Sequence, residues 1–457
     1  MEHFDAIIIG FGKGGKTLAL DLAARGEKVA MVERSADMYG GTCINIACIP
    51  TKALIHRAKI AEYLSLKTFG EKAAFYRRAI QEKNAITADL RQKNFNKLNA
   101  YPNVEIYTGL GAFLSSHQVE VTTEKNRFVI EGDRIFIDTG AESIIPPIRG
   151  IRESRRVYTS SSLMELEELP ERLVIIGSGY IGLEFASMFA GFGSKVVVLE
   201  NKPTFLQQED PIVADTVKRV LEKKGIEFRL NAEVDSITDT DEESVVGYRQ
   251  VVDQTEHSLF ADAILVATGR LAATESLNPG AAGVRTDAQG RILVDEYLQT
   301  TAPHIRAMGD VKGGAQFTYI SLDDYRIVRD HLYGPGIRNT RDREPIVYSV
   351  YIDPPLSRIG MTEQQAIAQG YEVMSKTIPV ETIPRARVMG NTDGILKSVV
   401  DTRTGKILGC TMFCLDSHEV INTVALAMKA QMSYLFLRDQ IYTHPSMSES
   451  FNDLFSF

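Results

Sequence analysis

The sequence predicts an α/β protein with two Rossmann-like dinucleotide-binding domains and a C-terminal α+β domain. The same Gly-rich turn between an apolar strand and a helix occurs twice, beginning at Gly10 and at Gly177. Two cysteines, Cys43 and Cys48, follow the first turn closely. From about Pro345 the pattern changes to a further set of short strands and helices, which predicts the third domain.

Composition and charge limit the kind of protein. The 457 residues are 44% hydrophobic and 24% charged, as in ordinary globular proteins. A net charge of −8 without a long basic cluster argues against a nucleic-acid partner, and four cysteines are too few for a secreted disulfide scaffold. An apolar strand follows Met1-Glu2-His3 directly, which leaves no room for a signal peptide, and no apolar run reaches membrane-spanning length. We expect a soluble cytoplasmic protein without a membrane partner.

The first Gly-rich turn has the spacing of a dinucleotide-binding unit. The apolar run 6–9 predicts a buried strand, and 16–24 predicts the helix whose N-terminus faces a bound phosphate. The next strand, 29–32, ends in Glu33, 23 residues after the first glycine, where a carboxylate can accept hydrogen bonds from ribose hydroxyls. The glycines needed for the tight turn, for approach of a pyrophosphate and for helix–strand packing are Gly10, Gly12 and Gly15.

The two cysteines predict a redox-active pair. Four residues separate Cys43 from Cys48, so a helix that begins near Cys43 places them about one and a half turns apart. The thiols then lie slightly off one helix face, and we expect a bridge between them to be strained and readily reduced. Two buried structural thiols are the alternative. Two nucleotide-binding units in the same chain favour the redox pair.

A helical segment and a β-rich segment complete the first unit. The stretch 53–98 is highly charged and poor in Gly and Pro, which is typical of amphipathic helices. Period-two alternation at 104–107 and 118–121 predicts strands, and the run 135–140 closes the unit. We expect the polar stretch 149–170 to be an exposed linker between domains.

The second unit repeats the first. An apolar run, 173–176, leads into the second turn, and the strand 196–199 ends in Glu200, again 23 residues after the first glycine. The first unit is 38 residues longer, about the length of the helical segment after the cysteines. The glycines of the second turn are Gly177, Gly179 and Gly182, and the Thr-Gly pairs that close the two units are Thr139-Gly140 and Thr268-Gly269.

Glu200 predicts a preference for NADH over NADPH. A carboxylate at this position bonds a free ribose 2′-hydroxyl and repels a 2′-phosphate. Asn201 and Lys202 follow it, rather than a pair of arginines. The charge of Lys202 acts against the preference.

The run 40–52, GGTCINIACIPTK, resembles the active-site disulfide segment of the FAD-dependent pyridine nucleotide-disulfide oxidoreductases, the family of lipoamide dehydrogenase, glutathione reductase and mercuric reductase. The resemblance covers essentially the whole chain, although Ala47 replaces the usual Gly. It implies tightly bound FAD in the longer, cysteine-bearing unit and exchanging NADH in the second unit. The implied domains are 1–150 and 271–340 for FAD, 151–270 for NAD(P)H and 341–457 for dimerisation.

The resemblance also implies catalytic roles. Cys48 would lie nearer the flavin as the charge-transfer thiolate, and Cys43 would attack the substrate. His444 would act as acid–base at the disulfide, oriented by Glu449. In the family this histidine reaches across the interface of a homodimer, so each active site needs two subunits.

Further positions match the family's cofactor contacts. Lys52 and Glu184 match the ion pair beside the flavin, and Tyr180 matches the aromatic residue that covers the nicotinamide face. The segment 300–311 resembles the second flavin motif, in which Asp310 would bond the ribitol chain. The other implied cofactor-binding positions are Gly41, Thr42, Ala112, Thr139, Gly140, Thr318 and Gly269.

The oxidant that accepts the electrons is the least determined feature. No cysteine pair follows His444 in the tail, so we expect no relay to a large acceptor, and a small electrophile such as hypothiocyanous acid fits. The alternatives are a lipoamide-dehydrogenase-like disulfide reductase, a reductase of metal ions such as Cu(II) or Hg(II), and a redox sensor with little turnover. We expect no resident metal. Cys410 and Cys414 lie in an apolar run and are expected to be buried thiols, with a second redox pair as the alternative.

Overall fold

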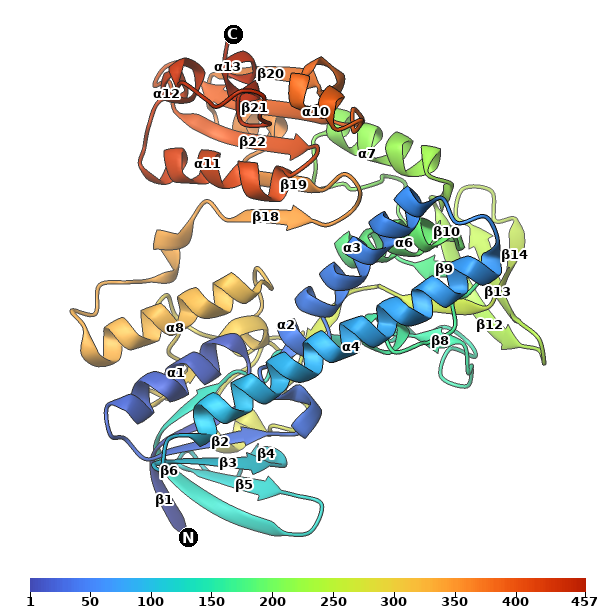
Figure 1. Cartoon of the computed structure of the whole chain (residues 1–457). Helices are drawn as coiled ribbons and strands as arrows, with labels where there is room; N and C mark the ends of the chain where they lie inside the picture. Colours follow the sequence, from blue (N-terminus) through green and yellow to red (C-terminus); the bar gives the residue numbers. More distant parts are fainter.

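Five sheets organise the computed structural model, which describes residues 1–457 (Figure 1). The largest contains the first Gly-rich turn. Its parallel strands, in order across the sheet, are β3 (Val104–Thr108), β2 (Val29–Glu33), β1 (Glu2–Ile9), β6 (Arg127–Ile137) and β17 (Ile305–Ala307). The long strand β6 also pairs antiparallel with β5 (Gln118–Thr122), which continues to β4 (Leu110–Phe113). Strand β17 thus brings a segment from beyond the second unit back into the first sheet.

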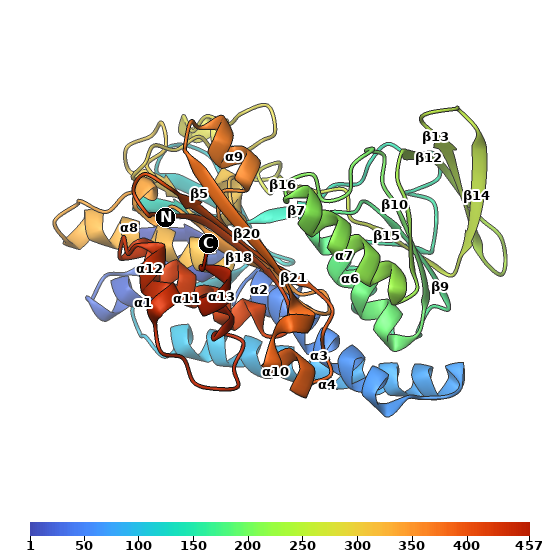
Figure 2. The ribbon, with the colours of Figure 1, turned by 90° about the horizontal axis from the view of Figure 1, so that it is seen from above.

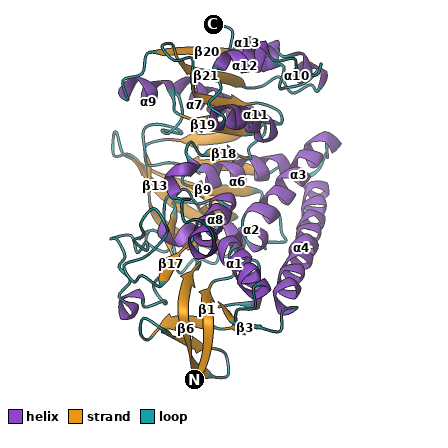
Figure 3. Cartoon of the chain, turned by 90° about the vertical axis from the view of Figure 1, so that its left-hand side faces the viewer, coloured by secondary structure: helices purple, strands orange, loops and turns teal.

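Two helices from distant parts of the chain cover one face of this sheet (Figure 3). They are α1 (Lys13–Ala24) and α8 (Thr318–Tyr333), and they pack against each other. Leu18 and Leu22 of α1 share a buried cluster with Ile327 and Val328 of α8 and with alternate residues of β1 and β2. The N-termini of both helices therefore lie at the same edge of the sheet, where the parallel strands end.

The cysteines lie on two helices. Cys43 belongs to the short α2 (Thr42–Asn45), whereas Cys48 begins α3 (Cys48–Leu64). One continuous helix from Cys43 does not form, because the backbone at Ala47, with φ −141° and ψ −103°, leaves the helical region. After α3 the chain forms α4 (Phe69–Asn99), which packs on α3 and starts with a Thr68–Glu71 capping box.

The second Gly-rich turn belongs to a five-stranded parallel sheet. Its strands, in order, are β11 (Ile226–Arg229), β10 (Lys195–Leu199), β9 (Arg172–Ile176), β15 (Ala263–Val266) and β8 (Val157–Tyr158). One face packs on α6 (Tyr180–Phe192) and α7 (Pro211–Lys223), and the other on an antiparallel sheet of β12 (Ala232–Asp239), β13 (Ser244–Gln250) and β14 (Glu256–Ala261). The short pair β7 (Ala141–Ser143) and β16 (Arg270–Ala272) joins the two units directly after their Thr-Gly pairs.

The stretch 149–170 is not the exposed linker that its polar composition predicts. Strand β8 pairs with β15 at the edge of the second sheet, and α5 (Ser160–Leu163) follows it. Ile151, Leu163 and Met164 are buried. A two-residue strand and isolated apolar residues produce no periodic pattern, so the packing of this segment cannot be predicted from the sequence.

The C-terminal part forms an antiparallel sheet at the opposite end of the molecule from β1 (Figure 1). Seen from above, the second unit extends to one side of this sheet (Figure 2). Its strands, in order, are β18 (Val347–Val350), β19 (Leu356–Gly360), β22 (Ile407–Phe413), β21 (Ile395–Asp401) and β20 (Val373–Pro379), and α11 (Ser417–Lys429) packs on it. The remaining short helices are α9 (Glu363–Ala368), α10 (Pro384–Val388), α12 (Tyr434–Asp439), α13 (Ser450–Leu454) and the 3₁₀ turns η1 (Ala36–Met38), η2 (Pro279–Ala282), η3 (Gly309–Lys312), η4 (Thr340–Arg343) and η5 (Val380–Thr382). The predicted fold class is therefore confirmed. None of the helices has both the length and the apolar composition that crossing a membrane requires.

Candidate active site

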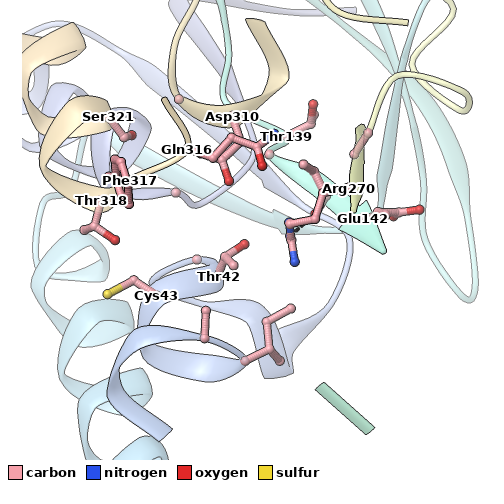
Figure 4. Close-up of a pocket in the computed structure, with 18 of the residues that line it drawn as sticks. Thr42, Cys43, Thr139, Glu142, Arg270, Asp310, Gln316, Phe317, Thr318 and Ser321 are labelled. Carbon is pink, nitrogen blue, oxygen red and sulfur yellow. Dashed lines mark hydrogen bonds between the residues drawn. The ribbon is translucent and has the colours of Figure 1, made fainter. Parts of the chain in front are cut away.

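A cavity of about 2080 Å³ lies where the three parts of the chain meet, and both Cys43 and Cys48 line it. Pockets for drug-sized ligands are about 300–1,000 Å³, so this one has room for larger ligands. Its wall combines the first Gly-rich turn, the start of α8, strands β7, β16 and β18, and helix α6. In Figure 4, Cys43 and Thr318 approach from opposite sides, with Arg270 and Glu142 further along the wall.

The glycines of the first turn pack directly against the chain's own backbone, with no room for a side chain. Gly10 has φ +103°, and a Cβ atom there would lie 2.2 Å from the carbonyl oxygen of Asp138. Gly41 has φ +83°, and its Cβ would lie 2.6 Å from Gly12 Cα. Thr139 lines the cavity, and its buried hydroxyl has no hydrogen-bond partner within the chain. Because buried polar groups are almost always paired, this hydroxyl and the bare turn fit the FAD that the sequence implies.

Glu33 and Glu200 occupy equivalent places in the two units. Glu33 Oε2 accepts a hydrogen bond of 2.9 Å from the backbone N–H of Phe11, the second residue of its turn. Glu200 Oε2 accepts bonds of 2.9 and 2.7 Å from the N–H and hydroxyl of Ser178, the second residue of the other turn. Burial raises the pKa of Glu33. Each carboxylate thus fixes its own turn and keeps lone pairs for a ribose hydroxyl.

Asp310 is half-buried on the cavity wall, among other charged residues. Partial burial raises its pKa, and the nearby Arg270 and Lys312 oppose that rise. Asp138, which is buried, accepts a hydrogen bond of 2.7 Å from the N–H of Gly15, and its burial holds its pKa well above the usual range. The carboxyl of Asp310 therefore faces a polar but poorly hydrated part of the cavity.

The redox pair is asymmetric. Both cysteines are half-buried free thiols, and Cys48 Sγ lies 3.4 Å from Thr318 Oγ1. The hydrogen bond from Cys43 lowers the pKa of Cys48 to about 6, against the effect of burial, with help from Thr318 and the charge of Lys52. The same hydrogen bond and burial raise the pKa of Cys43. A thiolate in this pair therefore resides on Cys48.

Lys52 and Glu184 form the ion pair that the sequence resemblance implies. Lys52 Nζ donates to both carboxylate oxygens of Glu184, at 2.9 and 2.7 Å. Glu184 also accepts a bond of 2.8 Å from the backbone N–H of Tyr351, whose ring centre lies 4.6 Å from Lys52 Nζ. The ammonium group is thereby fixed one helical turn after Cys48.

Tyr180 lies on the side of the cavity that belongs to the second unit. Its hydroxyl donates to Glu209 Oε1 at 2.8 Å and lies 3.0 Å from the hydroxyl of Tyr348. Burial and the Glu209 charge raise the pKa of Tyr180, so the hydroxyl stays protonated.

His444 does not line the cavity of its own chain. Its Nδ1 lies 2.6 Å from Glu449 Oε2, so the predicted pair forms. The His444 side chain is 70% exposed, whereas that of Glu449 is only 16% exposed. Glu449 therefore orients the imidazole of His444, which faces the solvent.

Not all of the expected cofactor-binding residues line the main cavity. Those that line the main cavity are Gly10, Gly12, Glu33, Gly41, Thr42, Lys52, Thr139, Gly140, Asp310 and Thr318. Gly179 and Gly269 line a smaller adjoining cavity that also contains Tyr180. Ala112 lines neither, whereas its neighbours Leu110 and Gly111 line the main cavity.

Several wall residues were not anticipated from the sequence. They are Glu142, Arg270, Gln316, Phe317 and Tyr351. Arg270 follows the closing Thr268-Gly269 pair, and Glu142 follows Thr139-Gly140 by two residues, so their nearness to repeated motifs was an available signal. The others carry no local pattern, because they reach the cavity only through tertiary packing.

Comparison with known proteins defines the family. The family model described as pyridine nucleotide-disulphide oxidoreductase matches residues 4–324, and the model of the family's dimerisation domain matches residues 346–455. The chain belongs to the pyridine nucleotide-disulphide oxidoreductase family. Enzymes of this family depend on FAD and a pyridine nucleotide, and the C-terminal domain of the chain is their dimerisation domain.

Individual members of the pyridine nucleotide-disulphide oxidoreductase family align over nearly the whole chain. The chain is 50% identical to the probable pyridine nucleotide-disulfide oxidoreductase RclA of Escherichia coli, covering 100% of this chain and 99% of that one. It is 32% identical to a mercuric reductase of Lysinibacillus sphaericus, over 98% of this chain and 81% of the relative. A solved Cu(II) complex of the HOCl-induced flavoprotein disulfide reductase RclA from E. coli superimposes with a TM-score of 0.93 at 49% identity, covering 100% and 99% of the two chains.

Cys410 and Cys414 lie apart from this site. Both are buried, and neither lines the cavity. Burial raises the pKa of Cys410 to about 12 and also raises that of Cys414. They have the character of structural thiols, as the sequence predicts.

Proposed function

We propose that this protein is an FAD-dependent NADH oxidoreductase that passes electrons through Cys43 and Cys48 to a small oxidant, preferentially hypothiocyanous acid. The observation that carries the proposal is the single cavity that contains both cysteines, the bare Gly-rich turn and Tyr180 of the second unit. The E. coli relative described as an HOCl-induced flavoprotein disulfide reductase supports a role in defence against oxidants. The cytoplasmic location stays a prediction.

The residues around the flavin position have separable tasks in this proposal. FAD, when bound, accepts hydride from NADH and delivers two electrons to the disulfide. Thr139 would donate to it, and Asp310 would hold its ribitol chain. Lys52, fixed by Glu184, places a positive charge near Cys48 and stabilises its thiolate. Cys48 is therefore the thiol that faces the flavin, and Cys43 is the one that meets the substrate.

Reduction of hypothiocyanous acid then follows from the two thiols. The Cys43 thiolate attacks the substrate sulfur, forming Cys43–S–SCN and releasing hydroxide, which takes up a proton to become water. The Cys48 thiolate attacks the Cys43 sulfur, releases thiocyanate and restores the disulfide. The net reaction, NADH + HOSCN → NAD⁺ + SCN⁻ + H₂O, consumes one NADH per hypothiocyanous acid and no further proton. Because its hydrogen bond to Cys48 and its burial raise the pKa of Cys43, the first step needs a base.

His444 of the partner subunit would supply that base. Within one chain the imidazole is exposed and lies outside the cavity, yet it is oriented by a mostly buried Glu449. A histidine held in this way is suited to complete a site on another subunit, and the dimerisation domain supplies the interface. We also propose a homodimer with shared active sites and a division into domains at residues 150, 270 and 340.

Steady-state NADH oxidation with a panel of acceptors tests this function. The panel contains hypothiocyanous acid, oxidised lipoamide, Cu(II) and Hg(II), each assayed with wild-type and Cys43→Ser protein. We expect the highest kcat/KM with hypothiocyanous acid and its loss in Cys43→Ser. A higher value with lipoamide would replace the proposed substrate, and binding of NADH without sustained turnover of any acceptor would indicate a redox sensor.

Reduction of Cu(II) is the second candidate. It is favoured by one observation, that the E. coli protein of 49% identity was solved as a Cu(II) complex. The same panel decides between the two, because it compares kcat/KM for Cu(II) directly with kcat/KM for hypothiocyanous acid.

A further inference from the structure

The hydroxyl of Tyr180 is held by a buried carboxylate that lies behind the cavity wall. Tyr180 and Tyr348 both line the cavity, whereas Glu209 does not. Both tyrosine hydroxyls donate to the same oxygen, Glu209 Oε1, at 2.8 and 2.5 Å. The three residues come from α6, from the loop before α7 and from β18, so three distant segments meet at one oxygen atom.

Arg358 pairs with the other oxygen of the same carboxylate. Arg358 Nη1 lies 3.3 Å from Glu209 Oε2, and the side chains of the two residues are 10% and 0% exposed. The guanidinium also lies over the ring of Tyr348, 5.2 Å from its centre, which holds that ring in place. Burial and the Glu209 charge raise the pKa of both tyrosines, so both hydroxyls remain donors.

The two tyrosines are not equivalent. Tyr348 is held by β18 and by Arg358, whereas Tyr180 begins α6 directly after the Gly-rich turn and contacts both the main cavity and the adjoining one. If Tyr180 leaves, Glu209 retains the hydroxyl of Tyr348 and the charge of Arg358. Release of Tyr180 from Glu209 therefore leaves no buried charge unpaired. An unpaired buried charge would cost far more free energy than the loss of this one hydrogen bond.

We propose that Glu209 is a positioning residue that latches Tyr180 over the nicotinamide side of the cavity, and that Tyr348 keeps Glu209 paired when the latch opens. The dinucleotide would bind by displacing the Tyr180 ring and breaking its bond to Glu209. This proposal rests on the proposed role of Tyr180 and adds the residues that control it.

Two single-hydroxyl deletions give opposite predictions. Tyr180→Phe removes the latch bond but keeps the ring, so NAD⁺ should bind the FAD-loaded protein roughly three- to thirtyfold more tightly. Tyr348→Phe leaves that bond intact but removes the partner of Glu209 in the open state, so NAD⁺ should bind more weakly. Isothermal titration calorimetry of NAD⁺ into the flavin-loaded protein measures both without turnover. The matched control is Tyr76→Phe, which removes a buried hydroxyl that donates to Leu166 O away from the cavity, and NAD⁺ affinity should not change.

An unchanged or weaker affinity in Tyr180→Phe, or a tighter one in Tyr348→Phe, would overturn the latch. Tyr180→Ala separates this failure from failure of the proposed function. If removal of the whole ring changes neither NAD⁺ affinity nor NADH oxidation, the proposed role of Tyr180 is wrong and the latch with it. If Tyr180→Ala changes the affinity but Tyr180→Phe does not, the ring covers the site and only the latch is refuted. The opposite shifts without turnover of any acceptor would support the latch and refute the proposed reaction.

Discussion

Cys48 Sγ lies 3.4 Å from the hydroxyl of Thr318, a residue 270 positions further along the chain. Thr318 is the first residue of α8, the helix that packs against α1 of the first Gly-rich turn. The start of α8 therefore adds a hydroxyl and the positive end of a helix dipole to the redox pair. Thiolate stabilisation at Cys48 thus depends on a segment that the chain supplies after the second unit.

The first prediction concerns the acidity of Cys48. Its pKa of about 6 lies below that of an ordinary thiol, so the thiolate persists above pH 6 and is lost as the pH falls through this value. Thr318→Val removes one stabilising hydrogen bond and should move the midpoint upward, whereas Thr318→Ser should retain it. The pH titration of the long-wavelength charge-transfer band in the reduced flavoprotein measures this midpoint.

The two cysteines should also separate in the same assay. Cys43→Ser should keep the band and lose turnover, because serine can still donate a hydrogen bond to Cys48 but cannot attack the substrate. Cys48→Ser should lose the band. A band that disappears with Cys43 instead would reverse the assigned roles.

The second prediction tests the fit of FAD. Purified protein should be yellow, with one FAD per chain. Gly41→Ala should lower FAD occupancy strongly, because its Cβ would lie 2.6 Å from Gly12 Cα at a φ of +83°. The control is Gly70→Ala in α4, where an added Cβ has no neighbour within 4 Å. Absorbance at 450 nm relative to protein gives the occupancy, and equal FAD content in both variants would contradict the assigned site.

The third prediction concerns the choice of dinucleotide. One close carboxylate contributes on the order of 1–3 kcal/mol, roughly ten- to a hundredfold in kcat/KM in favour of NADH. Glu200→Gln should narrow this gap by removing the charge while keeping an oxygen that can accept from the N–H of Ser178. Glu200→Ala should narrow it too but also loosen the turn. Equal efficiency of the wild-type protein with NADH and NADPH would refute the role of Glu200.

The fourth prediction tests whether active sites are shared. His444→Ala should lower kcat by about 10²–10⁴-fold, with a smaller effect on KM, because it removes an acid–base group rather than binding surface. Mixing Cys43→Ser subunits with His444→Ala subunits should restore one competent site in each heterodimer. Mass spectrometry confirms that heterodimers form. Heterodimers without activity would place His444 outside the chemistry or in the same subunit as the cysteines it serves.

Local patterns predicted most of the elements near the site. The strand–turn–helix units at Gly10 and Gly177 appear where the spacing places them, and β2 ends at Glu33 as expected. These features depend on contacts between residues close in sequence, which periodicity and glycine positions report directly. The prediction of an exposed linker at 149–170 was wrong, because the packing of this stretch depends on β15, about a hundred residues later in the chain.

The sequence by itself determined the two nucleotide-binding units, the candidate redox pair and, through resemblance, the family. Only the tertiary structure decided that the cysteines lie on separate helices, that Thr318 reaches Cys48, and that Glu209 joins Tyr180 to Tyr348. The physical reason is the distance over which each feature is specified. A turn or a strand is set by neighbouring residues, whereas the polarity of a buried thiol or hydroxyl is set by groups that folding brings from other domains.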